Sequence, residues 1–444
     1  MKRIFYTALT FIAMASCDVL ETEPQTSLES GSVLVDAASA NAILLGAYSE
    51  MQDINYYGAE FILNNDLIAD NSVYQGFYDS QLEIDQKAVP YTNLWVTESW
   101  VEIYEVINIS NLLITGVDGI DDPQLDRDLV YGEAHAIRAL AYFDLLRYFG
   151  EHYNLQSVYG LPLLLEPIPD NDFNQIPNLP RSTVQETYNQ INNDLAIAID
   201  LLQGTSDSGR MNYWAALSLR ARVSLYQKNY SQAFQDADMV IKSSPFALEP
   251  VLEDIYNTTE ASGESIFEIE YNEQDQSSFN TYTIRRDEYN VDEDLLDFFD
   301  ENDLRQAFVV EERGRLRTGK YLDPDNSNNA KIFRLTELYL IRSEAAVFSS
   351  NDPNAGSADL NEIRDRAGLG SVESFSSVTA YTDALLYERR AELNYEGHRF
   401  FDLVRFDRID QVLGMEDFRK VFPLPRNELQ TSDALEQNPG YPSS

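Results

Sequence analysis

The stretch from Asn212 to Pro245 constrains the fold most, because it has the pattern of two short helices packed in antiparallel order. Small residues, Ala221 and Ala233, stand where the two helices would face each other, and small side chains let helix axes approach closely. Pro245 ends the unit, because proline lacks a backbone N–H and clashes with the preceding helical turn. A helix pair of this kind must bury its apolar face on a neighbouring pair.

The spacing within this stretch is that of tetratricopeptide units, which are 34 residues long. Other segments place residues at intervals of three and four, which puts them on one helix face. These residues are Trp100, Tyr104, Ile107 and Asn111 in one helix, and Ala134, Ile137, Arg138, Ala141 and Leu145 in the next. Ser182 and Gln185 have the spacing of a capping box for a helix that ends at Leu202. We therefore expect a mostly α-helical scaffold of tetratricopeptide-like pairs over about 100–150, 182–245 and 333–413.

Two adjacent segments lack a helical period. Residues 265–271, SIFEIEY, alternate as a β-strand does, which predicts a minor β-hairpin element. Residues 272–290 are polar with scattered aromatics and are predicted to form a long functional loop. We expect residues 31–444 to form a single domain with long loops.

The N-terminus has the pattern of a secretory signal, with an apolar run from Ile4 to Ala15 after two basic residues. The run is shorter than the roughly 20 apolar residues that a spanning helix needs. Cys17 is the only cysteine of the chain and follows the run directly, so the junction resembles a lipobox. That resemblance implies a signal peptide over 1–16, a lipid on the Cys17 sulfur and a flexible tether over 17–30. Two or more acyl chains would hold such a protein stably on membrane lipid.

The chain is strongly acidic, with 74 acidic residues against 32 basic ones. Removal of residues 1–16 would leave 30 basic residues and a net charge of −44. A field of this sign repels phosphate backbones, which argues against nucleic acid as a partner. It also favours a neutral ligand over a polyanion.

Several segments, in order along the chain, resemble blocks of one protein family. Residues 387–406, YERRAELNYEGHRFFDLVRF, closely resemble the C-terminal signature of the SusD-like (RagB/SusD) nutrient-binding outer-membrane lipoproteins. Further similar blocks are IRALAYFDLLRY (137–148), RLTELYLIRSEAA (334–346), LNEIRDRAGL (360–369), FPLPRNEL (422–429) and LEQNPGY (435–441).

The resemblance implies an outer-membrane lipoprotein that faces the exterior of a Gram-negative cell. It also implies a SusC-like TonB-dependent transporter as a partner and captured glycans, or other oligomeric nutrients, as ligands. Two alternatives remain open from the sequence: capture of peptides by a member of the same family, and an interaction scaffold of the tetratricopeptide type.

The charged residues of the 387–406 signature are expected to be structural. They alternate in sign at helical spacing, which favours mutual ion pairs. The residues are Glu388, Arg389, Arg390, Glu392, Glu396, Arg399, Asp402 and Arg405. Gly397 would permit a tight break between two helices.

No pattern of catalytic residues emerges, and we expect the protein not to be an enzyme. The three histidines, His135, His152 and His398, are scattered, and no HExxH or GxSxG motif occurs. His135 lies on an apolar helix face and is expected to be a core residue. Residues 323–329 have part of the spacing of a calcium loop, but Asn328 stands in place of the turn glycine and Arg334 in place of the closing glutamate. We therefore expect neither a metal nor another cofactor.

Sugar rings bind to flat apolar side chains, so aromatic residues in non-periodic segments are the candidate ligand residues. Trp95 follows the polar stretch 79–93 and is the first candidate for a stacking platform. The other candidates are Tyr74, Phe77 and Tyr78 around Gly76, and Tyr282, Arg285 and Tyr289 in the loop 272–290. Binding to a neutral glycan should be insensitive to salt, whereas a steep salt dependence would indicate that Arg285 and Arg286 hold an anionic ligand.

Overall fold

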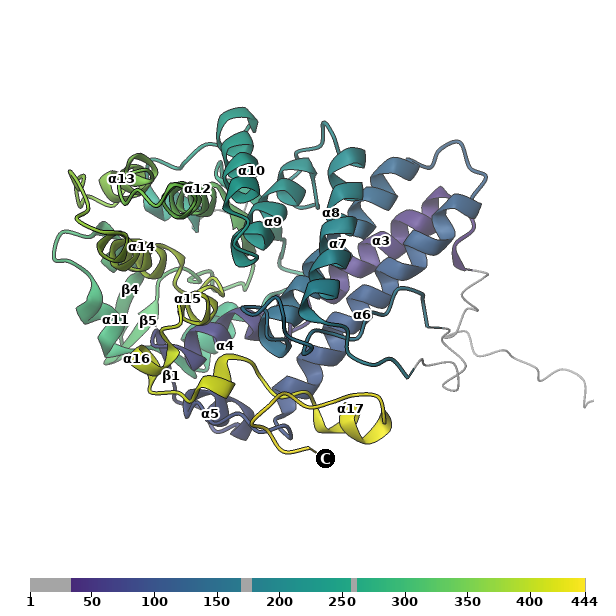
Figure 1. Ribbon diagram of the computed structural model, residues 1–444, viewed down its shortest axis with the longest axis horizontal. Helices are drawn as coiled ribbons and strands as arrows, with labels where there is room; N and C mark the ends of the chain where they lie inside the picture. Colours follow the sequence, from purple (N-terminus) through teal and green to yellow (C-terminus); the bar gives the residue numbers. More distant parts are fainter. Residues whose placement is uncertain (1–32, 169–177, 257–261, 444) are drawn as a thin grey trace, which may run out of the picture.

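The computed structural model describes residues 33–168, 178–256 and 262–443, and helices make up most of this part of the chain (Figure 1). The longer helices are α3 (Ala37–Met51), α4 (Glu60–Ile68), α6 (Leu94–Gly116), α7 (Arg127–Phe149), α8 (Val184–Leu201), α9 (Tyr213–Tyr226), α10 (Tyr230–Ser243), α12 (Leu335–Ser350), α13 (Ser357–Arg366) and α14 (Val378–Leu393). Shorter ones are α5 (Asp79–Asp85), α11 (Glu293–Phe298), α15 (Arg399–Arg405), α16 (Ile409–Leu413) and α17 (Arg426–Thr431). The predicted mostly α-helical fold is confirmed.

Helices α3, α6, α7 and α8 pack against one another as one group, in which α3 contacts both α6 and α7 (Figure 1). Side chains before each helix satisfy its first free N–H groups: Asn93 accepts from Val96 N, and Asp126 from Leu129 N. The capping box of α8 consists of Thr183 and Glu186, one residue later than predicted. Nearly all of α7 is buried, because α3, α6, α8 and α9 all pack against it.

The predicted helix pair within 212–245 is formed by α9 and α10. The Asn212 side chain accepts from the N–H groups of Trp214 and Ala215 and so begins α9. Helix α10 packs on α12, which pairs with α13, and α14 also lies against α12. The predicted helical region 333–413 contains the α12–α13 pair and then α14, which is followed by two short helices, α15 and α16, in place of one long partner. The chain breaks between α14 and α15 at Tyr395 and Gly397, which have φ of 57° and 78°.

Three small antiparallel sheets complete the described part of the chain. Strand β2 (Ser265–Ile269) pairs with β6 (Ala330–Arg334), β1 (Ser72–Tyr74) with β3 (Tyr289–Val291), and β4 (Val309–Glu312) with β5 (Arg315–Thr318). Because 330–334 form a strand, the first helix of the predicted region 333–413 begins at Leu335. The predicted loop 272–290 contains a π-helical turn, η4 (Thr281–Arg285), and the start of β3.

The charged residues of the 387–406 signature form buried ion pairs, as predicted. Arg389 Nε lies 2.7 Å from an Asp402 oxygen, and Arg334 Nε lies 2.7 Å from an oxygen of Glu396. Arg405 pairs with Glu344 at 2.7 Å. Since these side chains are almost fully buried, the pairs tie α14 and α15 to the rest of the core.

In the described ranges, none of the helices combines the length and the apolar character that crossing a membrane would require.

Candidate functional site

The structure brings together the two aromatic segments that the sequence analysis selected. Strand β1 ends at Tyr74, which pairs with Tyr289 of β3 in antiparallel register. One further backbone bond, from Gln75 N to the Glu288 carbonyl at 2.7 Å, extends the pairing. Residues 74–78 and 282–289 therefore form one continuous surface, although about 200 residues separate them in sequence.

Two exposed aromatic rings form the outer part of this surface. Phe77 is 74% exposed and Tyr78 is 44% exposed, which makes Phe77 the most exposed large hydrophobic residue of the described chain. Their rings stack on each other with centroids 4.6 Å apart and an interplanar angle of 29°. Stacked rings of this kind present a flat apolar face to solvent, which suits the apolar face of a sugar ring.

Arg286 holds Tyr78 in place from the second segment. Its guanidinium carbon lies 5.3 Å from the ring centroid of Tyr78 and 5.2 Å from that of Tyr282. It also donates to Tyr78 Oη at 3.1 Å and pairs with Glu288 at 2.7 Å. The cation–π contacts and hydrogen bond together restrict the orientation of the Tyr78 ring.

Tyr74, Tyr282 and Tyr289 lie beneath this surface, so they are wrong as direct ligand contacts. Each of the three side chains is buried. Tyr289 is fully enclosed, and its hydroxyl donates to Asn64 Oδ1 at 2.8 Å. Their rings contact one another: Tyr74 and Tyr282 both pack on Tyr289, with centroids 5.3 and 5.7 Å away. These tyrosines support the exposed pair.

A buried carboxyl group lies behind the tyrosines. Burial raises the pKa of Glu60 to about 7, although hydrogen bonds from Tyr282 and Gln81 oppose this effect. Glu60 and Glu288 are site residues that the sequence analysis missed. Glu288 stands two positions after Arg286, a spacing that could have indicated the pair, whereas nothing in the sequence links Glu60 to this segment.

Arg285, the last residue of η4, is exposed. One of its terminal nitrogens donates to the carbonyl of Pro324. Unlike Arg286, it has no carboxylate partner among the residues that the structure describes.

The Trp95 prediction is wrong, because the ring lies in the core. It is 1% exposed, and Nε1 donates to the Asn55 carbonyl at 3.2 Å. The rings of Tyr148 and Phe422 meet it edge-on, with centroids 5.3 and 5.8 Å away. Trp95 is the second residue of α6 and faces inward, so neither side of the indole is free for a sugar.

The other residues that were singled out from the sequence form no second ligand site or metal site in the described part of the chain. His135 is buried and pairs through Nδ1 with Asp194 at 2.7 Å, as expected of a core residue. In the segment 323–329, the Asn329 side chain bonds to Glu268 and the Tyr271 backbone. Over the described ranges no group of three or more acidic, histidine or cysteine side chains is arranged to hold a metal. Cys17 lies outside the described residues.

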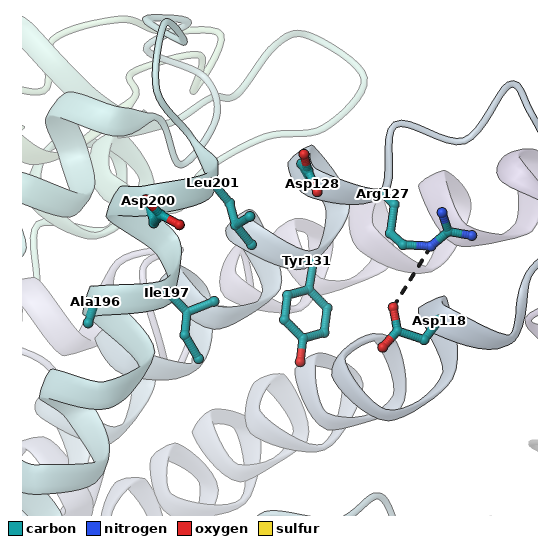
Figure 2. Close-up of a pocket in the computed structure, with 8 residues that line it drawn as sticks. All are labelled: Asp118, Arg127, Asp128, Tyr131, Ala196, Ile197, Asp200 and Leu201. Atoms are coloured by element: carbon teal, nitrogen blue, oxygen red, sulfur yellow. Dashed lines mark ion pairs between the residues drawn. The ribbon is translucent and has the colours of Figure 1, made fainter.

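A groove of about 660 Å³ lies elsewhere, between the start of α7 and the end of α8 (Figure 2). Its lining consists of Asp118, Arg127, Asp128, Tyr131, Ala196, Ile197, Asp200 and Leu201. Arg127 and Asp118 form a loose ion pair at 3.9 Å across one edge. None of the predicted ligand residues lies in this groove, and its single aromatic ring offers less stacking surface than the Phe77–Tyr78 pair.

Comparisons with known proteins agree with this architecture. A family model described as "Starch-binding associating with outer membrane" matches residues 18–225, and a model of the SusD family matches residues 308–420. SusD-like protein P2 of Formosa agariphila is 24% identical over 99% of this chain and 100% of its own length.

Solved structures share the fold. A SusD superfamily protein of Bacteroides vulgatus has a TM-score of 0.79 and 27% identity, over 92% of this chain and 100% of that one. A laminarin-binding SusD-like protein has a TM-score of 0.78 and 23% identity, over 92% and 100% of the two chains. The family models, the full-length relatives and the shared helical fold together place this chain in the SusD-like family of carbohydrate-binding proteins.

Proposed function

We propose that this protein captures oligosaccharide or polysaccharide on the Phe77–Tyr78 surface and delivers it to a SusC-like TonB-dependent transporter. The observation that carries the proposal is the exposed, stacked aromatic pair, which Arg286 holds in one orientation. Sugar rings would stack on the aromatic faces, and the guanidinium and carboxylate groups around them would bond to the hydroxyls.

The relatives support a glycan as the ligand, since one protein of the same fold is described as binding laminarin. The net charge of −42 favours a glycan whose backbone is neutral. A capture protein must also release its ligand, so we expect affinities in the micromolar to millimolar range, about 4–8 kcal/mol. The role is one of binding, not of catalysis.

The location at the cell surface belongs to the same proposal. A lipid on Cys17 would hold the protein on the outer membrane, facing the exterior. The Cys17→Ala variant should then be found in the soluble fraction, and its continued presence in the outer-membrane fraction would contradict the anchor.

Calorimetric titration against a panel of glycans tests the binding site. The Phe77→Ala variant should lose most of the affinity for any glycan that the wild type binds, with little change in melting temperature, because Phe77 makes few core contacts. Phe234→Ala is the matched control, since Phe234 is also an exposed phenylalanine, at 38%, but lies on α10. Equal affinities of the Phe77→Ala variant and the wild type would exclude the Phe77–Tyr78 surface as the glycan-binding site. Binding of peptides in place of glycans would favour the peptide-capturing alternative.

A further inference from the structure

Four arginines gather around the aromatic surface, although basic residues are scarce in this chain. Arg285 ends η4 and Arg286 follows it, whereas Arg313 and Arg315 belong to the β4–β5 hairpin. The hairpin lies against the surface, because β5 contacts both β3 and η4. All four side chains are at least partly exposed.

Three of the four arginines have a carboxylate partner, and two of these partners, Asp287 and Glu312, are shared with the buried Arg317. Arg286 pairs with Glu288 at 2.7 Å, Arg315 with Asp287 at 3.1 Å and Arg313 with Glu312 at 3.5 Å. Arg285 differs, because none of the described carboxylates lies within ion-pair distance of it. Most other arginines of the described chain form such a pair, which makes this free guanidinium unusual.

The environment of Arg285 suits an incoming anion. A guanidinium has five N–H donors, and one terminal nitrogen of Arg285 donates to the Pro324 carbonyl. This contact fixes the side chain and leaves other donors free for a bidentate bond to a carboxylate or sulfate. Arg286, the next residue, lies over Tyr78, so Arg285 stands one position along the chain from the residue that holds the aromatic pair.

We infer that the captured glycan carries an acidic substituent, a carboxylate or a sulfate ester, and that Arg285 binds it. This inference rests on the proposed function of the Phe77–Tyr78 surface. The acidic groups of the ligand must be sparse, because two carboxylates, Asp287 and Glu288, follow the two arginines in the chain and Glu288 pairs with Arg286.

Matched pairs of glycans test the inference. The probes are oligogalacturonate with its methyl ester, which differ in the carboxylates, and a sulfated carrageenan oligosaccharide with its desulfated form. The wild type should bind at least one acidic form about tenfold more tightly than its neutral partner, as a charge-assisted bond predicts. The pair that shows the preference identifies carboxylate or sulfate as the group.

Variants separate the role of the charge from that of the aromatic surface. Arg285→Gln should abolish the preference for the acidic form and leave the affinity for the neutral form unchanged. Phe77→Ala should weaken the binding of the acidic and the neutral form by the same factor. Lys228→Gln is the control, because Lys228 is an exposed cation in the turn between α9 and α10. This change should alter neither the preference for the acidic form nor the affinity for the neutral form.

Two outcomes would overturn the inference. One is equal binding of the acidic and neutral forms by the wild type, with Phe77→Ala still impairing binding, which would leave the proposed function intact. The other is an equal loss of affinity for the acidic and the neutral form in Arg285→Gln, which would mean that Arg285 bonds to sugar hydroxyls. If the wild type binds none of these probes and no other glycan, the proposed function itself fails.

Discussion

The rings of Tyr74 and Tyr289 meet edge to face, with centroids 5.3 Å apart, and join two segments that are distant in sequence. Tyr74 ends β1 and Tyr289 begins β3, so the ring contact and the strand pairing reinforce each other. Edge-to-face pairs contribute about 0.5–1.5 kcal/mol beyond the area that they bury. The position of the exposed Phe77–Tyr78 pair therefore depends on a buried contact that touches no ligand.

Gly76 gives the first prediction, because a side chain there would displace Tyr74. A Cβ at position 76 would overlap the phenol of Tyr74, and that ring would have to move away from Tyr289. We expect Gly76→Ala to weaken glycan binding severalfold while the protein remains folded. Titration of the variant with a bound glycan measures the loss.

Gly46→Ala is the control for this change. Nothing lies within 4 Å of a Cβ at position 46, which is inside α3. Alanine in a helix interior is more stable than glycine by roughly 0.5–1 kcal/mol, so this variant should be slightly stabilised and bind normally. Unchanged binding by Gly76→Ala would show that the Tyr74 ring does not position the surface.

Trp95 gives the second prediction, because its core position implies an effect on stability only. Trp95→Ala should lower the free energy of unfolding by about 3–5 kcal/mol, as for other large aromatic residues in cores. Trp95→Phe should be destabilised less and should bind glycan as the wild type does. Chemical denaturation and titration of both variants measure the two effects separately. A stable Trp95→Phe protein without glycan affinity would contradict the core placement.

Local patterns in the sequence predicted the helices well, because helical periodicity and capping depend on neighbouring residues. The spacing of Ala221, Ala233 and Pro245 predicted the helix pair that α9 and α10 form. The capping box of α8 was misplaced by only one residue, because Thr183 and Glu186 have the same spacing as the predicted Ser182 and Gln185. The break after α14 was predicted at Gly397, whose φ is 78°, whereas the left-handed conformation of Tyr395 is not suggested by its residue type.

The candidate site could be predicted only in part, because its assembly depends on contacts between distant residues. Sequence identified both aromatic segments but not which rings face outward. Trp95 was misassigned for this reason: Phe422, which covers it, lies more than 300 positions later. The β1–β3 pairing that buries Tyr74 and Tyr289 is equally non-local.

The third prediction concerns Glu396, which neutralises two buried cations. Its oxygens lie 2.6 Å from Lys320 Nζ and 2.7 Å from Arg334 Nε, and Tyr256 donates to it at 2.6 Å. Although burial opposes it, the positive charges of Arg334 and Lys320 hold the pKa of Glu396 below its usual value. Glu396→Gln should therefore lower the free energy of unfolding by about 3–5 kcal/mol, because Lys320 would lose its carboxylate partner.

Asp383→Asn is the matched control for Glu396→Gln. The pair of Asp383 with Arg408 is 3.3 Å long, and the Asp383 side chain is 63% exposed. Exposed pairs contribute little, so this variant should change stability by less than about 1 kcal/mol. Similar denaturation midpoints for the two variants would contradict a structural role for the buried cluster.

The fourth prediction concerns acid stability and rests on His152. Its ring is fully buried between Tyr226, Tyr153 and Phe401, and neither ring nitrogen has a partner in the described structure. Burial, together with the positive charges of Arg147 and Arg405, lowers the pKa of His152 to about 3. The ring is therefore neutral in the folded protein at any pH well above that value.

The sign of the pH effect follows from the unfolded chain, where a histidine has a pKa of about 6.5. Between pH 6.5 and 3 the unfolded state binds the extra proton, so His152 makes the folded state less stable as the pH falls. Its contribution approaches about 1.4 kcal/mol per pH unit within this window and is absent above it.

His152→Phe removes the titrating group without breaking a hydrogen bond. Denaturant titrations at several pH values should show that wild type and variant have parallel stabilities above pH 7 and diverge below pH 6, with the variant losing less. Parallel curves down to pH 4 would mean that His152 is protonated in the folded protein or gains a partner there.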